Sequence, residues 1–540
     1  MKALLFGLVG LLAGTGGGLI VTLGLVVARA RFEGAYFHDP AEVVGWVGLP
    51  LLIGPIAGAW IGAADPPEES VLPGSVIGLV LGGLLGALLG SIGDDPTGVW
   101  AGIVMGAALG LVLGVWVPLL RHFRRRQRAL EGGWELGKRR PLLVSLVITA
   151  ALLAPLAVLA ARGGAPAPPC SERIEPEPDP ADVESVILLL GDAGDARFGS
   201  APILPRVQAE VERWSALLER DSAVVVALLG DIVYPGGVRS VGELGRDEDS
   251  TRVADQVALV AGPSARARGA RARFLAGNHD WGERRDHEGA VRVHQLDELL
   301  EALHRAGAPV ALLPDAGTGG PAVVDLGAHV RLVLLATAWW LLAENPAARV
   351  DVLRGVADAL ATADGRAVVV LAHHPFATGG PHGGVATLGR ALGVEQLLSR
   401  SGARIQDLSS RPYLELKRGL ADLFAVHGAP ILFAGGHEHS IQVLRGAGPS
   451  EPTWTLVSGS ASKSTGVGMV PGLIFARAEP GFARLLVLKD GGLHLTIETA
   501  PAEYLACPAA DVARIACMAD GVGAYRVAWS GRLDGNPGSR

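Results

Sequence analysis

Five short blocks of the sequence combine carboxylate, amide and imidazole side chains in a pattern suited to metal binding. Most of them directly follow a run of aliphatic residues, as expected where a strand ends and delivers the next residues to one edge of a sheet. The blocks are Gly191-Asp192-Ala193-Gly194, Gly230-Asp231-Ile232-Val233-Tyr234, Gly277-Asn278-His279-Asp280, Ala372-His373-His374-Pro375 and Gly436-His437-Glu438-His439. The sequence therefore predicts that these blocks meet at one site.

The donor types suit a pair of cations acting on a phosphate ester. Ester hydrolysis places negative charge on the attacking and leaving oxygens, and two cations about 3.5–4 Å apart can activate a hydroxide and neutralise that charge. Such a pair needs ligands from several strand ends and one shared carboxylate. The side chains of the required types are Asp192, Asp231, Asn278, His373, His437 and His439.

The ordered set of blocks resembles the calcineurin-like metallophosphoesterase superfamily, and it is most similar to the purple acid phosphatases of the tartrate-resistant type. Most superfamily members begin with Asp-x-His, but Gly194 stands where that His would be. Tyr234 follows Asp231 by three residues, which is where purple acid phosphatases carry a tyrosine ligand. The resemblance covers roughly residues 185–465.

The resemblance implies a ligand set for two metal ions that share Asp231. The first ion would take Asp192, Asp231, Tyr234 and His439, and the second would take Asp231, Asn278, His373 and His437. A phenolate ligand favours a hard trivalent ion, so Fe(III) is implied at the first position. Iron, zinc or manganese is implied at the second, because the ligand types there suit all three.

Two further histidines receive catalytic roles from the resemblance. His279 follows Asn278, where the family places a phosphate-binding and proton-donating histidine, and His382 lies nine residues after His373, where another active-site histidine stands. A metal-activated hydroxide would attack phosphorus, and one of these side chains would help the leaving oxygen depart. His374 occupies a variable position in the family and is expected at most to support a ligand.

The chain from residue 183 onward alternates short apolar runs with amphipathic segments, which predicts an α/β domain. The expected strands are Val186–Leu190, Ala223–Leu229, Leu332–Ala336, Ala367–Leu371 and Pro430–Phe433, followed by hairpin strands at Trp454–Val457, Arg484–Leu488 and Leu493–Ile497. The expected helices are Val207–Glu219, Val293–Ala306 and Val350–Ala363. The resemblance implies a layered α-β-β-α sandwich over residues 183–500.

The flanking segments have their own compositions. Residues 162–182 are rich in proline and are expected to form a stiff, extended linker. Residues 501–540 form a C-terminal tail that the pattern does not assign. Cys507 and Cys517 lie close together in that tail, and either a disulfide between them or two buried thiols fits the spacing.

The first 161 residues predict an all-α bundle of about five transmembrane helices in front of the sandwich. The whole chain is 49% hydrophobic with a mean hydropathy of +0.35. Uncharged apolar stretches close to the roughly 20 residues that cross a bilayer recur in this segment. They are Ala3–Ala28, Val43–Ala64, Val71–Gly93, Thr97–Leu120 and Pro141–Ala161.

The distribution of positive charge predicts a topology for this multi-pass membrane protein. The loop Arg121–Arg140 holds more Lys and Arg than any other short loop, so the positive-inside rule places it in the cytoplasm. The catalytic domain would then lie on the extracytoplasmic side. Cleavage of a signal peptide at Ala28-Arg29-Ala30 would leave the later loops on the same sides.

Charge also narrows the choice of partners. Residues 1–163 carry 12 Lys/Arg and 10 Asp/Glu, whereas the remainder carries 35 and 44. An acidic domain is a poor candidate for binding nucleic acid through phosphates. The absence of charge within the apolar stretches argues against a transporter.

The expected function is hydrolysis of phosphomonoesters outside the cytoplasm by a membrane-anchored binuclear phosphatase. One alternative is a phosphodiesterase of the same superfamily that acts on nucleotides, lipids or wall polymers. Another is a catalytically silent metal-binding sensor, although no expected ligand is missing from the sequence. The physiological substrate and the oligomeric state stay open.

Overall fold

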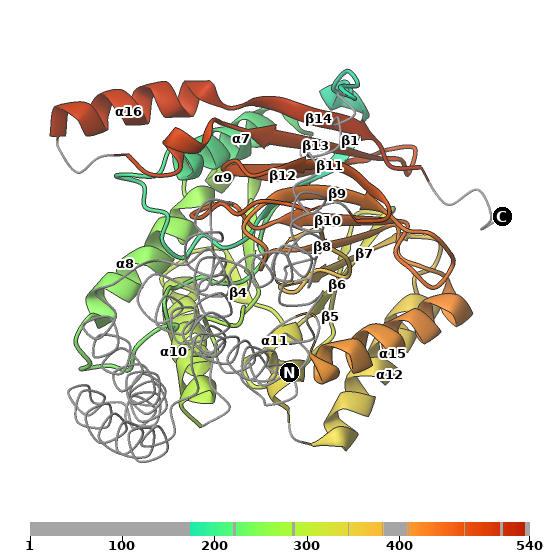
Figure 1. The fold of residues 1–540 in the computed structure, drawn as a ribbon. Helices are drawn as coiled ribbons and strands as arrows, with labels where there is room; N and C mark the ends of the chain where they lie inside the picture. The colour runs from blue at the N-terminus through green and yellow to red at the C-terminus, as the bar shows by residue number, and fades with distance from the viewer. Residues whose placement is uncertain are drawn as a thin grey trace, which may run out of the picture. The chain divides into compact units, whose positions relative to one another are not determined.

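Two seven-stranded β-sheets form the centre of the part of the chain that the computed structural model describes (Figure 1). The described residues are 173–219, 223–282, 287–343, 345–380, 382, 408, 410–468, 470–507 and 511–534. All of them belong to one compact unit that extends over Gly163–Arg540.

The first sheet has a parallel half and an antiparallel half. Strands β1 to β4 run parallel to one another, and β12, β13 and β14 continue the sheet beyond β1 in antiparallel fashion. In spatial order the strands are β14 (Arg526–Arg532), β13 (Leu493–Thr499), β12 (Gly481–Leu488), β1 (Val183–Leu190), β2 (Ala223–Leu228), β3 (Arg271–Phe274) and β4 (Val310–Leu312).

The second sheet is also mixed. Strands β6, β7, β8 and β10 are parallel, and antiparallel strands lie at both edges. In spatial order they are β11 (Leu473–Arg477), β9 (Ile441–Arg445), β10 (Trp454–Ser458), β8 (Leu432–Gly435), β7 (Ala367–Ala372), β6 (Val330–Leu335) and β5 (Ala322–Leu326).

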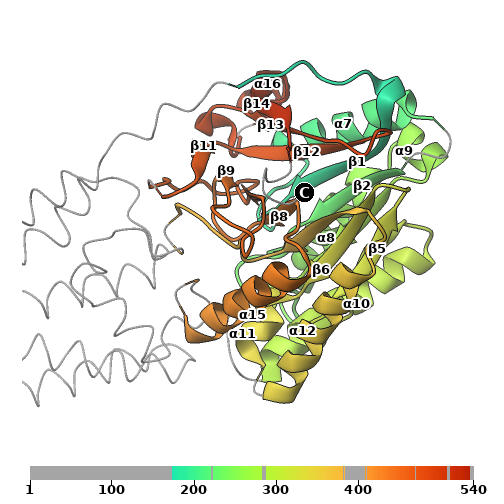
Figure 2. The same cartoon turned by 90° about the vertical axis from the view of Figure 1, so that its right-hand side faces the viewer.

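Helices cover the outer face of each sheet, and α12 and α15 lie side by side on the second (Figure 2). The first sheet is covered by α7 (Ile203–Leu217), α8 (Arg246–Val257), α9 (Pro263–Arg268) and α10 (His287–Arg305), and the second by α11 (Thr337–Leu342), α12 (Pro346–Ala361) and α15 (Arg411–His427). The remaining elements are η3 (Pro180–Asp182), η4 (Ala258–Val260), η6 (Ala502–Tyr504) and α16 (Asp511–Ala524).

The continuous apolar runs of the sequence have a simple structural reason. Successive side chains of a strand point to opposite faces, so a strand buried on both faces is apolar throughout. In β1, Ile187 and Leu189 pack in the core between the sheets, whereas Val186, Leu188 and Leu190 pack against the first helix layer. The two sheets with their outer helices therefore fit the expected layered sandwich.

The fold class nevertheless needs a correction, because the expected transmembrane bundle is not shown. No helix of the described residues has the length and apolar composition needed to cross a membrane. Even α10, with 19 residues, has charged residues along its sequence. The five apolar stretches that suggested the bundle lie outside the described residues. What is shown is a mixed α/β fold with two sheets, and integral membrane association has no support.

The first and last described segments of the chain pack onto the first sheet. Ile174 forms a bridge with Ser530 of β14, and the carboxylate of Glu177 pairs with the guanidinium of Arg484 in β12. The segment beyond residue 500 contains β14, which is one of the two edge strands of the first sheet (Figure 1). Cys507 and Cys517 form a disulfide that joins α16 to the preceding loop.

Candidate metal centre

The five sequence blocks follow the carboxyl ends of five strands, β1, β2, β3, β7 and β8. In each sheet these strands are parallel, so their carboxyl ends lie at one edge. Backbone hydrogen bonds then join the blocks to one another: Asp192 N–H donates to Gly230 O at 3.0 Å, and Gly436 N–H donates to His373 O at 2.8 Å. Gly191 N–H also donates to Ser458 O of the second sheet at 2.7 Å, so the blocks of the two sheets meet at one place.

One group of donor atoms surrounds the hydroxyl of Tyr234. That oxygen lies 3.0 Å from Oδ1 of Asp192 and 3.0 Å from Oδ2 of Asp231. Nε2 of His439 lies 3.3 Å from the same hydroxyl and 3.5 Å from Oδ1 of Asp192. These are the four side chains expected at the first metal position.

A second group of donor atoms surrounds Oδ1 of Asn278. Nε2 of His373 lies 2.8 Å from this oxygen, and Nδ1 of His437 lies 2.9 Å from it. The two ring nitrogens are 3.3 Å apart, and Nε2 of His373 lies 3.4 Å from Oδ1 of Asp231. These are the four side chains expected at the second position, and Asp231 belongs to both groups.

The spacing within each group fits ligands that share one ion. Protein nitrogen and oxygen ligands lie about 2.0–2.2 Å from a transition metal, so two of them at right angles are about 3 Å apart. The ligand atoms of Asp192, Asp231 and His373 lie within 4.8 Å of one another, as do those of His373, His374 and His437. The mixture of carboxylate, phenol, amide and imidazole donors suits iron, zinc or manganese.

Hydrogen bonds behind the donor atoms fix their orientation. Nδ1 of His373 donates to Leu229 O at 2.8 Å, which leaves Nε2 with a lone pair for an ion. Oδ2 of Asp192 accepts the backbone N–H of His437 at 2.7 Å. Oδ1 of Asp231 accepts the backbone N–H of His279 at 3.0 Å. These hydrogen bonds therefore hold the donor atoms in place.

Backbone strain concentrates at the same residues. Four non-glycine residues of the described chain have a left-handed φ, and three of them are Asp192 at 60°, Asp231 at 56° and His437 at 66°. This conformation costs roughly 1–2 kcal/mol for each residue with a Cβ. Such strain is typical of sites where geometry is selected over stability.

Two glycines let the blocks approach one another. A Cβ on Gly277 would collide with Oδ1 and the backbone nitrogen of Asp231, and a Cβ on Gly436 would collide with Oδ2 of Asp192. Both contacts involve atoms of the candidate site, so neither glycine can be replaced without displacing a donor.

Asp280 is a structural member of the site to which the sequence analysis gave no role. Its buried carboxylate accepts backbone N–H groups from Ile232 at 2.9 Å, Val233 at 3.1 Å and Gly277 at 2.8 Å. It therefore ties the Asp231 loop to the Asn278 loop. Its position two residues after Asn278, within a chemically dense block, was the available signal.

His279 and His382, expected to be catalytic, both border the donor groups. Nδ1 of His279 donates to Pro235 O at 2.6 Å, and its Nε2 lies 3.9 Å from Oδ2 of Asp231. The ring of His382 packs on that of His437, with centroids 4.3 Å apart, while its Nδ1 lies 3.2 Å from Oε2 of Glu438. Both rings are held beside the site through Nδ1.

Two other side chains contact the donors. Nδ1 of His374 lies 2.8 Å from the hydroxyl oxygen of Thr337, and its ring centroid is 4.3 Å from that of His437. Nζ of Lys463 lies 3.3 Å from the centroid of the Tyr234 ring. Lys463 belongs to the Ser458–Lys463 turn, so this turn brings a positive charge against a candidate ligand.

Burial and mutual charge separate the pKa values of the two aspartates. Burial, reinforced by the charge of Asp231, raises the pKa of Asp192 to about 7. Burial opposes ionisation of Asp231 too, but the charges of His373 and His279 outweigh it and lower the pKa to about 2. Burial also raises the pKa of Tyr234 well above its ordinary value. Without a cation, the group around Tyr234 thus resists full ionisation.

Burial and neighbouring positive groups also favour the neutral form of two imidazoles, those of His439 and His437. The pKa of His439 falls to about 3 because of burial and the charges of His382 and Lys463. Burial lowers the pKa of His437 well below its ordinary value, with the neighbouring histidines adding to the effect. Neutral imidazole is the form that binds a metal ion.

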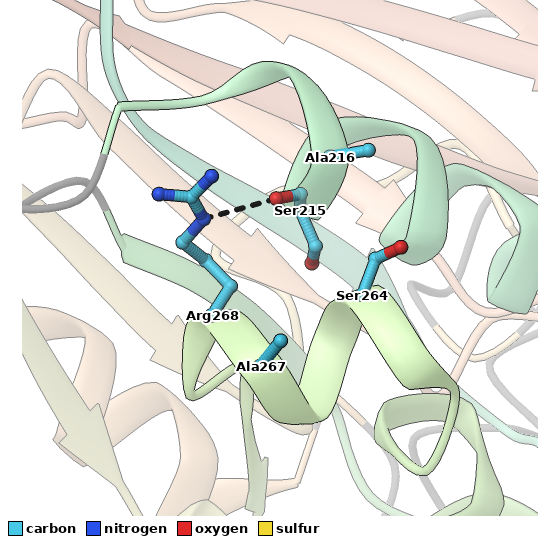
Figure 3. Close-up of a pocket in the computed structure, with 5 residues that line it drawn as sticks. All are labelled: Ser215, Ala216, Ser264, Ala267 and Arg268. Atoms are coloured by element: carbon cyan, nitrogen blue, oxygen red, sulfur yellow. Dashed lines mark hydrogen bonds between the residues drawn. The ribbon is translucent and has the colours of Figure 1, made fainter.

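A pocket elsewhere on the unit is lined by none of the candidate metal ligands (Figure 3). It encloses about 330 Å³ between α7 and α9, and its lining residues are Ser215, Ala216, Ser264, Ala267 and Arg268. Nε of Arg268 donates to Ser215 O at 3.0 Å. None of the candidate ligands lines it, so it is separate from the metal centre.

Comparison with known proteins finds similarity in structure only. No family model matches the chain, and no curated protein does. One similar solved structure is GAP50, the anchor in the inner membrane complex of Plasmodium, with 13% identity, a TM-score of 0.35 and coverage of 59% of this chain and 85% of that one. Another is the purple acid phosphatase PPD1 from yellow lupin seeds, with 14% identity, a TM-score of 0.39 and coverage of 64% and 53%. Both TM-scores are below 0.5, so function is inferred below from the geometry of the site.

Proposed function

We propose that this chain is a binuclear metal-dependent phosphatase that hydrolyses phosphomonoesters. The observation that carries this conclusion is the division of the Asp231 carboxylate between two donor groups. Its Oδ2 lies 3.0 Å from the Tyr234 hydroxyl, and its Oδ1 lies 3.4 Å from Nε2 of His373. A carboxylate with one oxygen in each group is suited to bridge two cations.

The ligands of the two ions would differ in hardness. Asp192, Tyr234 and His439 would complete the first position, where the phenol oxygen favours Fe(III). Asn278, His373 and His437 would complete the second, for iron, zinc or manganese. When bound, the two cations supply an activated water and neutralise the charge that develops on the phosphate.

The chain itself contributes two imidazoles beside the donor groups. Nε2 of His279 faces the first group, 3.9 Å from Oδ2 of Asp231, and would bind a phosphate oxygen there. His382 packs on His437 and would donate a proton to the ester oxygen as the P–O bond breaks. A water oxygen bonds to phosphorus and the electrons of the broken bond pass to the ester oxygen, so the products are an alcohol and inorganic phosphate.

A substrate panel with purified, metal-loaded protein tests the proposal. We expect phenyl phosphate and p-nitrophenyl phosphate to be hydrolysed, with bis(p-nitrophenyl) phosphate turned over at least about tenfold more slowly. Faster hydrolysis of the diester would favour the phosphodiesterase alternative. A full metal load without hydrolysis of any ester would support the silent sensor.

We also propose that the domain works outside the cytoplasm. The Cys507–Cys517 disulfide supports this location, because disulfides persist in oxidising compartments. Alkylation of free thiols in protein isolated from its host, followed by mass spectrometry, tests it. Labelling of both cysteines without prior reduction would contradict the proposed location.

A further inference from the structure

Glu438 is a buried carboxylate between two candidate ligands. Its side chain is 0% exposed, and His437 and His439 on either side of it belong to different donor groups. An ionised carboxylate without compensation in such a place would carry a large desolvation cost. Compensation comes from His382, whose Nδ1 lies 3.2 Å from Oε2 of Glu438.

The contact with Glu438 fixes where the His382 ring stands. The ring centroid lies 4.3 Å from that of His437 at an interplanar angle of 39°, and 6.3 Å from that of His439 at 82°. His382 therefore borders a candidate ligand of each metal position. An imidazole that donates its Nδ1–H to a carboxylate is held in one orientation, so that a proton given to a leaving oxygen comes from Nε2.

The backbone that leads to His382 is hydrogen-bonded to β9, the strand that follows Glu438. Gly379 N–H donates to Oε1 of Gln442 at 2.7 Å, and Nε2 of Gln442 donates to Oγ of Ser440 at 2.9 Å. A Cβ on Gly380 would collide with Oε2 of Glu438, so the chain passes directly against the carboxylate. The segment that ends at His382 thus lies directly against the Glu438 side chain.

We propose that Glu438 is a positioning residue for ester hydrolysis, and that it acts by holding the His382 ring in the orientation that directs Nε2, as the proton-carrying atom, to the leaving oxygen. This role depends on the proposed phosphatase function. Glu438 does not touch the substrate in this assignment, and its effect on the rate passes through His382 alone.

A double-mutant cycle in the full-length, metal-loaded protein tests the role. E438Q, H382A and the double variant are compared on phenyl phosphate and p-nitrophenyl phosphate. We expect each single change to lower kcat for phenyl phosphate by roughly 10²-fold, and less for p-nitrophenyl phosphate, whose leaving group needs less help from a proton. The double variant should be no slower than H382A. Multiplied losses, or equal losses on both esters, would overturn the assignment.

Two further readouts separate positioning from a general loss of structure. E438Q should keep two metal ions per chain, and loss of one would mean that Glu438 acts through His437 or His439. The matched control is E415Q. Glu415 accepts a hydrogen bond from Arg411 on α15, so its substitution should leave kcat for both esters unchanged.

A spectroscopic readout does not need activity. In zinc-loaded protein labelled with ¹⁵N-histidine, Nδ1 of His382 should be protonated in the wild type, and the signal is assigned by its absence in H382A. E438Q should change that signal. An unchanged signal would overturn the role of Glu438. If the wild type hydrolyses neither ester, the phosphatase function fails, and the ¹⁵N signal still decides whether Glu438 positions His382.

Discussion

The hydroxyl oxygen of Tyr234 lies 3.0 Å from Oδ2 of Asp231, the residue three positions before it. The other oxygen of the same carboxylate lies near His373, at the end of a strand in the other sheet. One aspartate thereby connects donor atoms that come from the two halves of the sandwich. The relationship places a phenol at one end of the site and imidazoles at the other.

Asp231→Asn should abolish most of the hydrolysis with any metal. The amide cannot bridge two cations as a carboxylate does, so we expect kcat to fall by on the order of 10³-fold and bound metal to fall below two ions per chain. Steady-state kinetics and elemental analysis measure both. Asp364→Asn is a matched control. Asp364 also has a left-handed φ, but it pairs with Arg366, which is not a candidate ligand. Retained turnover in the Asp231 variant would disprove the bridging role.

Tyr234→Phe should bleach the protein. A tyrosinate bound to Fe(III) absorbs visible light by charge transfer, so the wild type should be coloured and the variant should lack the band. Tyr413→Phe is the control: its buried hydroxyl donates to Pro375 O, and its loss should cost about 1 kcal/mol of stability without a change in colour. A colourless, iron-free and active wild type would rule out Fe(III) at the first position and leave the two-metal site standing.

Metal-free protein should lose stability as the pH rises above 6.5. The pKa of Asp192 is raised from 3.8 to about 7 by burial and Asp231, so the folded state holds a proton that the unfolded state lacks, and stability is lost as pH rises through 7. The pKa of His439 is lowered from 6.5 to about 3 by burial and His382, so this group loses stability only below 6.5, where the unfolded chain takes up a proton, and there it opposes the effect of Asp192.

Denaturant unfolding in the presence of a chelator measures this pH dependence. Between pH 6.5 and 8 the expected loss is on the order of 1 kcal/mol. Asp192→Asn, which cannot ionise, should lose less over the same interval. Stability that rises steadily from pH 6.5 to 8 in the metal-free wild type would contradict the raised pKa of Asp192.

Asp280→Asn should weaken metal binding although Asp280 donates nothing to an ion. Its carboxylate accepts three backbone N–H groups, and an amide would replace one acceptor oxygen with a donor. We expect a loss of roughly 2 kcal/mol in the free energy of unfolding and a metal affinity lower by about 10–100-fold. Asp249→Asn is the control, since Asp249 is equally buried but pairs with Arg239, and it should destabilise the fold without lowering metal affinity. Equal metal affinities in the Asp280 and Asp249 variants would refute the role of Asp280 in joining the Asp231 and Asn278 loops.

Much of the sandwich could be predicted because the sequence signals are local. The run Val186–Leu190 within β1 is apolar throughout, and Asp192 follows it within two residues, so strand and candidate ligand are read from one short segment. The same holds for β7 and His373. The conversion of residue types into a ligand set came from the resemblance, which placed Tyr234 and Asn278 beside the carboxylates.

The features that the sequence analysis did not predict depend mainly on contacts between segments far apart in the chain. Asp280 bonds residues 47 and 48 positions away, and Glu438 reaches His382 across 56 positions, so neither role could be read from spacing. Strand β14 was missed because it lies at a sheet edge, where only three of its seven residues are buried, and it lacks a continuous apolar run. The predicted transmembrane bundle was wrong as part of the fold class. It was based on hydropathy alone, and no helix of the described residues is long and apolar enough to cross a membrane.

Anomalous diffraction from crystals of the metal-loaded protein tests the central claim most directly. We expect two metal peaks about 3.5–4 Å apart, with Oδ2 of Asp231 bound to the ion beside Tyr234 and Oδ1 bound to the ion beside His373. A single peak, or two peaks that do not share Asp231, would contradict the account.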